Sequence, residues 1–322
     1  MQNFENKLPR TVKYYKEDGT PVFKKKFKEV NIVNQRGKID KIIFGIIFII
    51  FTIHAITLFY PILWLLVNSL KTKEEYLGGS ALAFPNELVF ENYALAFTSL
   101  EVKKTTFGGM LFNSLWYTVI MAIETTFIPL TVGYVLSKYK FIGRNFLYTL
   151  AIVSLTIPII GSTASQMKLV SEMGIKDTLI YPIIASAGGF SGSFLISYGF
   201  FKSMSWSYAE AAKIDGANAF KIYFSVMLPQ ALPISLTFMI THAIGYWNEY
   251  NTIILYMPSF PTLASGLFEY KEVIVRHPNE VLKKHYPVYY SGLVISIIPC
   301  VILFAAASSK IFTSLSIGGL KG

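Results

Sequence analysis

The stretch that decides the fold is "SYAEAAKIDGANAFKIYFSVMLPQALP", residues 207–233. It mixes lysine, glutamate and aspartate with many alanines, and it lies between two long apolar runs of the chain. A charged passage in such a place is typical of a loop that joins two membrane-spanning helices. Its meaning therefore depends on how the rest of the chain divides between membrane and water.

The composition of the chain is that of a membrane protein. It has 322 residues, of which 53% are hydrophobic and 15% charged, and its mean hydropathy is +0.47. A soluble globular chain is nearer a quarter charged. The single cysteine, Cys300, lies in an apolar run, which excludes an intrachain disulfide and predicts a small core residue.

Six runs are long enough to cross a bilayer, which takes about 20 apolar residues. They are residues 42–67, 105–137, 145–167, 178–201, 222–248 and 286–309. The sequence therefore predicts an all-α polytopic membrane protein with six transmembrane helices. A further uncharged segment, residues 250–268, is interrupted by Pro258 and Pro261, which predicts a helix end followed by an external loop.

Glu124 is a charged residue inside the second run. A charged side chain at a helix centre costs about 2.5–3.5 kcal/mol on insertion. The twelve Leu, Ile, Val and Phe residues between positions 111 and 137 each favour insertion by about 0.3–0.6 kcal/mol, roughly 4–7 kcal/mol together. The apolar side chains outweigh the charge, so this run is still expected to span.

The basic residues orient the spans with both termini in the cytoplasm, because short cytoplasmic loops carry an excess of Lys and Arg. Residues 1–41 hold eleven Lys or Arg against five Asp or Glu, and residues 138–144 hold three basic residues and no acidic one. The loop at residues 207–229 then faces the cytoplasm. The basic leader is expected to lie near anionic lipid, with nucleic-acid binding as the alternative.

The loop itself predicts two short helices at an angle. Ser207 and Glu210 have the spacing of a capping box, which predicts a helix from Tyr208 to about Ile214. Gly216 is expected to end that helix in the left-handed conformation, and Asn218 to cap the next one.

The second predicted helix has one apolar face, made by Phe220, Tyr223, Phe224 and Met227, and Pro229 closes it. Ala211 and Ala212 on the first helix are small enough for a partner's backbone to approach closely. From these residues alone, a docking site for a partner and an interfacial helix that only anchors the loop both remain open.

The spacing of the loop resembles the EAA loop of ABC-transporter permeases: Glu210-Ala211-Ala212, then Asp215-Gly216-Ala217, then Leu228-Pro229. In that family the loop forms coupling helices that seat in a groove on a cytoplasmic ATPase subunit. The resemblance implies that this role falls to Glu210, Ala211, Ala212, Asp215, Gly216, Ala217, Phe220, Leu228 and Pro229.

The resemblance covers nearly the whole chain from residue 60 onward and is similar to the maltose type of carbohydrate importer permease. Its further landmarks are Asn68-Ser69-Leu70-Lys71-Thr72, Glu91-Asn92-Tyr93, Asn113-Ser114, Trp247-Asn248-Glu249, Thr262-Leu263, Gly266-Leu267, Pro299 and residues 318–322. Two departures are the long leader and residues 271–285, which look like an insertion.

The resemblance implies a type I importer fold in a multi-pass protein of the bacterial cytoplasmic membrane. The implied partners are a second homologous permease, two cytoplasmic ATPase subunits and an extracellular solute-binding protein. The implied plan is a leader at residues 1–41, a first span at 42–67, an external loop at 68–104, a permease core at 105–310 and a tail at 311–322. Within the core, spans are expected at about residues 111–137, 145–167, 178–201, 232–256 and 286–309, with the coupling loop at 207–229.

The chain lacks the sequence of a phosphate-binding loop. Its Gly-Lys pair, Gly37-Lys38, is followed by Ile39 and has no glycine five residues earlier. ATP hydrolysis is therefore expected in a separate chain, which would hold the ATP and magnesium, and no cofactor is expected here. The four histidines show no metal-ligand spacing.

Two polar stripes are candidates for the path of a hydroxyl-rich solute, because intramembrane polar residues usually face a bundle interior or a wet cavity. Helix–helix packing by small polar residues is the alternative. Tyr246 or Trp247 is expected to stack on a sugar face. The remaining candidates are Asn113, Tyr117, Glu124 and Thr131 in the second run, and Thr237, Thr241, Gly245, Asn248, Glu249 and Thr252 in or after the fifth.

Two other functions are weighed against an ATP-driven sugar permease. An ion-coupled secondary transporter would use Glu124 and Glu249 as proton carriers. A rhomboid-like intramembrane protease would pair Ser191 with His242. The glycines at 188 and 192 already make a small-xxx-small packing motif, and neither alternative explains the loop at residues 207–229.

Overall fold

The computed structural model describes residues 12–15, 21–23, 38–157, 161–276 and 286–319. The rest of the leader, residues 277–285 and residues 320–322 lie outside this part, together with what was predicted for them. The chain forms two compact units, residues 1–61 and residues 62–322. In the first, β1 (Val12–Tyr15) pairs antiparallel with β2 (Pro21–Phe23). This hairpin is a departure from the all-α prediction.

A long apolar helix, α1 (Lys38–Ser69), begins in the first unit and ends in the second. Its large apolar side chains from Ile39 to Leu63 are exposed. A helix that is apolar all round and not covered by protein is suited to lipid. This agrees with the first predicted span.

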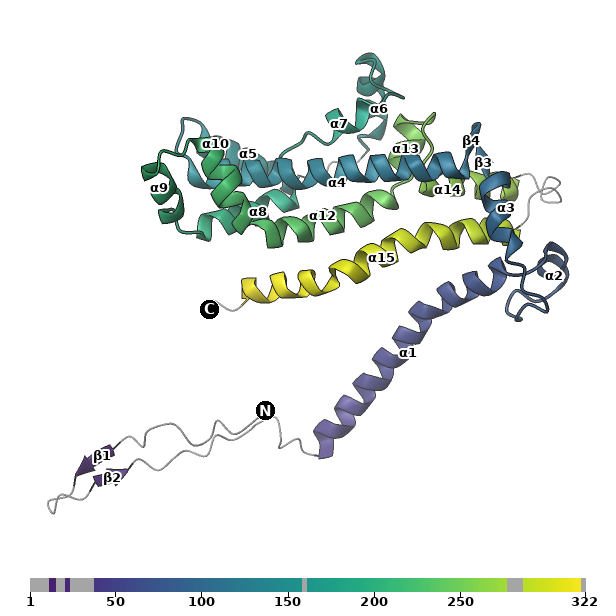
Figure 1. The fold of residues 1–322 in the computed structure, drawn as a ribbon, viewed down its shortest axis with the longest axis horizontal. Helices are drawn as coiled ribbons and strands as arrows, with labels where there is room; N and C mark the ends of the chain where they lie inside the picture. The colour runs from purple at the N-terminus through teal and green to yellow at the C-terminus, as the bar shows by residue number, and fades with distance from the viewer. Residues whose placement is uncertain (1–11, 16–20, 24–37, 158–160, 277–285, 320–322) are drawn as a thin grey trace. The chain divides into compact units, whose positions relative to one another are not determined.

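The second unit is built around α4 (Phe107–Lys138), which packs lengthwise against α8 and α12, while α15 lies along α12 (Figure 1). Its other elements are α2 (Lys73–Gly78), α3 (Glu91–Ser99), β3 (Glu101–Val102), β4 (Thr105–Thr106), α5 (Arg144–Thr156), α6 (Thr163–Glu172), α7 (Tyr181–Ala185), α8 (Gly192–Ser203), α9 (Ser207–Ile214), α10 (Ala219–Ile222), the π-helix η2 (Tyr223–Met227), α11 (Leu228–Gln230), α12 (Leu232–Trp247), α13 (Asn251–Tyr256), α14 (Leu263–Arg276) and α15 (Tyr286–Gly319).

Within the described residues, three helices are long and apolar enough to cross a membrane: Ile39–Ser69, Phe107–Lys138 and Tyr286–Ala307. The pair Ala219–Gln230 and Leu232–Trp247, bent by 76°, makes a fourth if it is one span. The runs at residues 145–167 and 178–201, each expected as one helix, are divided into shorter helices. The described residues therefore form a helical membrane protein, and the predicted count of six spans is not confirmed.

Local sequence explains both divisions. Ile157, at the end of α5, has φ −78° and ψ 115°, because Pro158 disfavours a helical conformation in the residue before it. The second break falls between α7 and α8, where Ser191 caps α8 by accepting a hydrogen bond from the Phe194 amide. The predicted packing motif at Gly188 and Gly192 is wrong, since both have open space around them.

Close packing of α8 on α4 instead depends on Gly133. A Cβ atom there would lie 2.9 Å from both the Ser197 Cβ and the Tyr198 amide nitrogen. Such distances are too short for a side chain, so a glycine lets the two helices meet.

One end of α4 is fixed in an apolar cluster that we call the end layer. It joins α3, β3, α14 and the first turns of α4 and α15, and its buried residues include Leu100, Phe107, Leu263, Leu267 and Val288. The loop predicted within residues 250–268 is confirmed only between Met257 and Thr262, because α14 begins at Leu263. Residues 263, 267, 270 and 274 of α14 are buried, at the spacing of one helix face.

Candidate functional site

Residues 207–230, which we call the α9–α11 unit, fold into the two short helices that their sequence predicts. The first is α9, and the left-handed Gly216 follows it with φ +78°. The Asn218 side chain then accepts a hydrogen bond of 2.8 Å from the Lys221 amide at the start of α10. These three local predictions are confirmed.

Two other predictions for the unit are wrong. Trp206 occupies the N-cap of α9 without a side-chain cap, and the Ser207 hydroxyl bonds to that of Ser205 at 2.7 Å, so no capping box forms. The expected single apolar face is also split: Tyr223 is 7% exposed, whereas Phe220 is 76% exposed. The two side chains are three residues apart, which places them about 60° apart around the helix axis, and only Tyr223 packs on α4, against Tyr134.

The split leaves the unit with an unpartnered surface. Its exposed large apolar side chains are Tyr208, Ile214, Phe220 and Phe224. Among the predicted coupling residues, Glu210, Ala211, Asp215 and Pro229 are exposed as well, and Ala212, Ala217 and Leu228 are half-buried against the apolar cluster beneath the unit. An apolar patch rimmed by charged residues is typical of a protein–protein contact.

The buried side of the unit is attached to α4. The Tyr223 hydroxyl lies 2.7 Å from Thr131 Oγ1, and its ring stacks on Tyr134 with centroids 4.8 Å apart. At the other end of the unit, Lys138 donates a hydrogen bond of 2.6 Å to the Met204 carbonyl and lies over the Trp206 ring. Thr131, expected in a solute path, therefore belongs to this attachment.

Of the path candidates on α4, Asn113 and Tyr117 lie inside the fold. Asn113 donates to the Pro261 carbonyl at 3.0 Å and accepts from the Trp116 indole at 3.1 Å. Tyr117 is 1% exposed, its ring meets Tyr246 edge-on, and its hydroxyl has no hydrogen-bond partner among the described residues. Asn113 thus ties α4 to the loop before α14.

Near the middle of α4, three successive residues face polar groups of α12 and of the residue that follows α7. Glu124 accepts a hydrogen bond from the Ser186 hydroxyl at the end of α7. Thr125 lies near the Tyr246 hydroxyl on α12, and Thr126 lies 3.2 Å from His242 Nδ1 on the same helix. We call this group the polar belt; its members are Glu124, Thr125, Thr126, Ser186, Ser193, His242 and Tyr246.

Contacts within the polar belt exclude the predicted Ser191–His242 pair. His242 Nε2 lies 3.2 Å from Ser193 Oγ, and Ser191 is occupied in capping α8. The pair does not form. Sequence analysis missed the contact of His242 with Thr126 and Ser193, for which mid-span polar residues on three runs were the only signal.

On α12 the path candidates fall into two groups. Thr241, Gly245 and Asn248 are exposed on one face, with Thr241 and Asn248 bonded to carbonyls of their own helix. Trp247 is 6% exposed and donates to the Ser296 carbonyl on α15 at 2.8 Å. Trp247 therefore packs between α12 and α15, and its predicted stacking on a sugar stays a prediction.

The residues after α12 serve its connection to α13. Glu249 Oε1 accepts a hydrogen bond of 2.9 Å from the Thr252 amide, which satisfies a free amide in the first turn of α13. Thr252 itself is half-buried. Thr237, also half-buried, bonds the Pro233 carbonyl at 3.0 Å.

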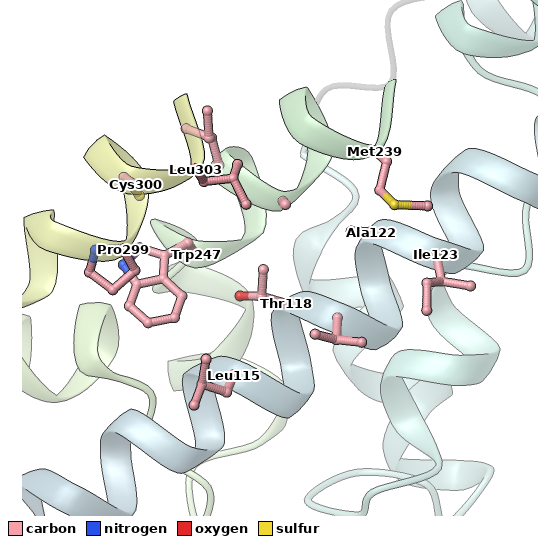
Figure 2. A pocket seen from close by; sticks show the side chains of 12 residues that line it. Leu115, Thr118, Ala122, Ile123, Met239, Trp247, Pro299, Cys300 and Leu303 are labelled. Carbon is pink, nitrogen blue, oxygen red and sulfur yellow. The ribbon is translucent and has the colours of Figure 1, made fainter. Parts of the chain in front are cut away.

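A pocket of about 290 Å³ lies between α4, α12 and α15 (Figure 2). Its walls are almost wholly apolar, and the figure shows Thr118 facing Trp247 and Pro299 across it. The chemistry of these walls does not suit a hydroxyl-rich solute.

In the described residues, no three His, Cys, Asp or Glu side chains come together as metal ligands would.

Comparison with known proteins identifies the family. The profile described as "binding-protein-dependent transport system inner membrane component" matches residues 129–313, which include the α9–α11 unit and the polar belt on α8 and α12. The chain belongs to this family. It is the permease component of an ABC importer, and ATP hydrolysis belongs to a separate subunit.

Similar curated proteins cover most of the chain. It is 27% identical over 272 residues to the diacetylchitobiose uptake system permease protein NgcG of Streptomyces coelicolor, covering 83% of this chain and 85% of that protein. It is 27% identical over 298 residues to the arabinooligosaccharides transport system permease protein AraQ of Halalkalibacterium halodurans, covering 89% and 100%.

A solved structure shows the same fold. It is a chain of a bacterial ABC transporter involved in the import of the acidic polysaccharide alginate, with a TM-score of 0.69 and 23% identity. The match covers 85% of this chain and 98% of that one. The shared fold therefore extends over most of this chain.

Proposed function

We propose that this chain imports a sugar or oligosaccharide across the bacterial cytoplasmic membrane. The similar permeases named for diacetylchitobiose and arabinooligosaccharides support this class of solute. In the proposed arrangement both termini are cytoplasmic, and α5 with α6 and α7 with α8 serve as two broken spans. The complex would contain a second permease, two ATPase subunits and an extracellular binding protein.

The α9–α11 unit is the proposed seat of the ATPase. The observation that carries this proposal is the exposed apolar surface around Phe220 on a unit whose other side is attached to α4. When ATP closes the ATPase dimer, the unit moves with it, and the helices switch between inward-open and outward-open arrangements. The exposed stripe of Thr241, Gly245 and Asn248 is the proposed wall of the solute path.

Substitution of Phe220 tests the seat. Phe220→Asp places a charge in the apolar surface, so the ATPase should no longer co-purify and uptake should stop, while the protein stays inserted. Leu82→Asp, at another residue with an exposed side chain, is the matched control and should keep both. Normal ATPase binding in the Phe220 variant contradicts the proposed seat.

Uptake measurements test the solute class. Cells that carry the whole transport system should accumulate one of a panel of radiolabelled neutral oligosaccharides, including diacetylchitobiose and arabinotriose, only when the permease is present. Uptake should persist when the proton gradient is collapsed and ATP is maintained. Failure of every saccharide, with the ATPase still bound, rejects the solute class and leaves the seat standing.

The orientation has its own measurement. Lys213 is exposed on α9, so a cysteine placed there in a Cys300→Ser background should react with a membrane-impermeant maleimide. Labelling is expected in inverted vesicles but not in intact cells. Labelling in intact cells rejects the cytoplasmic placement of the α9–α11 unit.

A further inference from the structure

We propose that Tyr223 is the positioning residue that transmits movement of the α9–α11 unit to α4. The inference rests on the proposed function, because it requires an ATPase that moves the unit. Its subject is the contact behind the docking surface: a tyrosine held by Thr131 and Tyr134, which we call the tyrosine socket.

The hydrogen bond in the socket has a definite direction. Thr131 donates its only hydroxyl hydrogen to the Phe127 carbonyl at 2.7 Å, as a helical threonine often does. Its oxygen can then only accept from the Tyr223 hydroxyl, 2.7 Å away. Tyr223 is therefore fixed at both its hydroxyl and its stacked ring, which leaves it little freedom to slip along α4.

The unit has two different faces. It continues after Tyr223 as a π-helix, since the Leu228 amide bonds the Tyr223 carbonyl, five residues back. Phe220 and Tyr223 come before that wider turn and lie about 60° apart around the helix axis. Tyr223 turns into the socket, and Phe220 stays on the exposed surface. A partner bound at Phe220 therefore moves a segment whose buried side contacts α4 through Tyr223.

The far end of the unit reaches the same part of α4. The Trp206 ring lies edge-on to Tyr139, and the Tyr139 hydroxyl lies 3.2 Å from that of Tyr134. Tyr134 therefore takes part in both attachments. Between them, the two attachments hold only the last turns of α4.

Pro129 lies just before the socket, inside α4. Proline has no amide hydrogen, so the helix loses the hydrogen bond to the carbonyl of Thr125. The polar belt begins directly beyond it, at Thr126, Thr125 and Glu124. A pull on Tyr223 therefore acts on a short helical segment that ends at a weakened turn beside the polar belt.

Distance measurements between two spin labels test the proposal on the purified complex with its ATPase. Labels would be placed at Val135→Cys, on the last turns of α4, and at Ala94→Cys on α3 in the end layer, both exposed positions, in a Cys300→Ser background. The parent complex should show a change in this distance between the nucleotide-free state and the state trapped with ATP and vanadate. A parent that binds no ATPase defeats the proposed function before any socket variant is compared.

Variants of the tyrosine socket then test whether the distance change depends on it. Tyr223→Phe and Thr131→Val remove the same hydrogen bond, so each should reduce the distance change, and the double variant should reduce it no further. Tyr223→Ala should abolish most of it with the ATPase still bound. Tyr76→Phe is the matched control, because it removes a tyrosine–hydroxyl bond of 2.7 Å, to Tyr290 in the end layer, and should leave the change intact.

A purely structural role for Tyr223 would lower thermal stability without altering the distance change. A full distance change in Tyr223→Ala therefore overturns the proposal. Loss of ATPase binding in Tyr223→Phe also overturns it, because Tyr223 would then act in docking and not in transmission. If Tyr223→Ala does not fold, the proposal is judged from the distance changes of Tyr223→Phe, Thr131→Val and their double variant.

Discussion

The two ends of α4 are held in different ways. At the Phe107 end, buried side chains satisfy backbone groups: Ser114 on α4 accepts from the Leu263 amide at 2.7 Å, and in the adjoining α3 Asn92 donates to the Ser69 and Lys71 carbonyls at 2.9 Å each. At the Lys138 end, the attachments are aromatic stacking, one tyrosine hydroxyl and one lysine. The contacts at the Phe107 end fix α4 in the end layer. The contacts at the Lys138 end join α4 to the α9–α11 unit and leave the opposite surface of that unit exposed.

The largest effect on stability is expected at the fixed end. Asn92 is 4% exposed, and Asn92→Ala leaves the Lys71 carbonyl without this donor and the Ser69 carbonyl with the Ser291 hydroxyl, so it should lower the free energy of unfolding by about 2–3 kcal/mol. Thermal unfolding of the purified protein in detergent measures this loss. Asn251→Ala, at an exposed residue, is the control, and equal melting temperatures for the two variants would remove the contrast between the ends.

A smaller loss is expected at the attached end. Lys138→Met removes a charged donor from the Met204 carbonyl and should cost about 1.5–2 kcal/mol of stability. Uptake should fall more than stability does, because this contact holds the start of the α9–α11 unit. Lys140→Met, two residues on and exposed, should change neither quantity. A transport loss no larger than the stability loss argues against the division between the ends.

A change on the exposed face of α12 should affect transport alone. Asn248→Ala removes a polar side chain that donates hydrogen bonds to the Ile244 carbonyl of its own helix and to Cys300, so assembly should be unchanged. Uptake should fall about three- to tenfold, the loss of roughly one hydrogen bond to the solute. Unchanged uptake removes this stripe from the proposed path.

The smallest effect is expected at the surface of the end layer. Lys103 and Glu269 form an ion pair of 2.8 Å with side chains 43% and 22% exposed. Lys103→Ala should cost about 0.2–1 kcal/mol, and high salt should reduce the difference. A loss as large as that of Asn92→Ala would show that the end layer depends on surface charge.

Local signals in the sequence were sufficient for several features. The left-handed Gly216 and the capping Asn218 are where their spacing predicts, because a short-range preference decides each of them. The apolar runs identified a membrane protein for the same reason. The helix ends before Pro158 and before Ser191 also follow from local sequence, although counting uncharged residues alone did not reveal them.

Other features could not be predicted because distant residues decide them. Trp247 is of a residue type that can stack on a sugar ring. Its indole N–H donates a hydrogen bond to the Ser296 carbonyl on α15, 49 residues further along the chain. His242 faces Thr126, 116 residues distant, and not Ser191. Tyr223 and Phe220 are three residues apart, and contacts with Thr131 and Tyr134 on α4 decide that Tyr223 is the buried one.

The sequence by itself determined that this chain lies in a membrane and that two short helices meet near Gly216, because hydropathy, capping and glycine geometry act over a few neighbouring residues. The tertiary structure alone decided which side chains hold α4 and which stay free. Those assignments depend on contacts between helices that are far apart in the chain, and no local period encodes them.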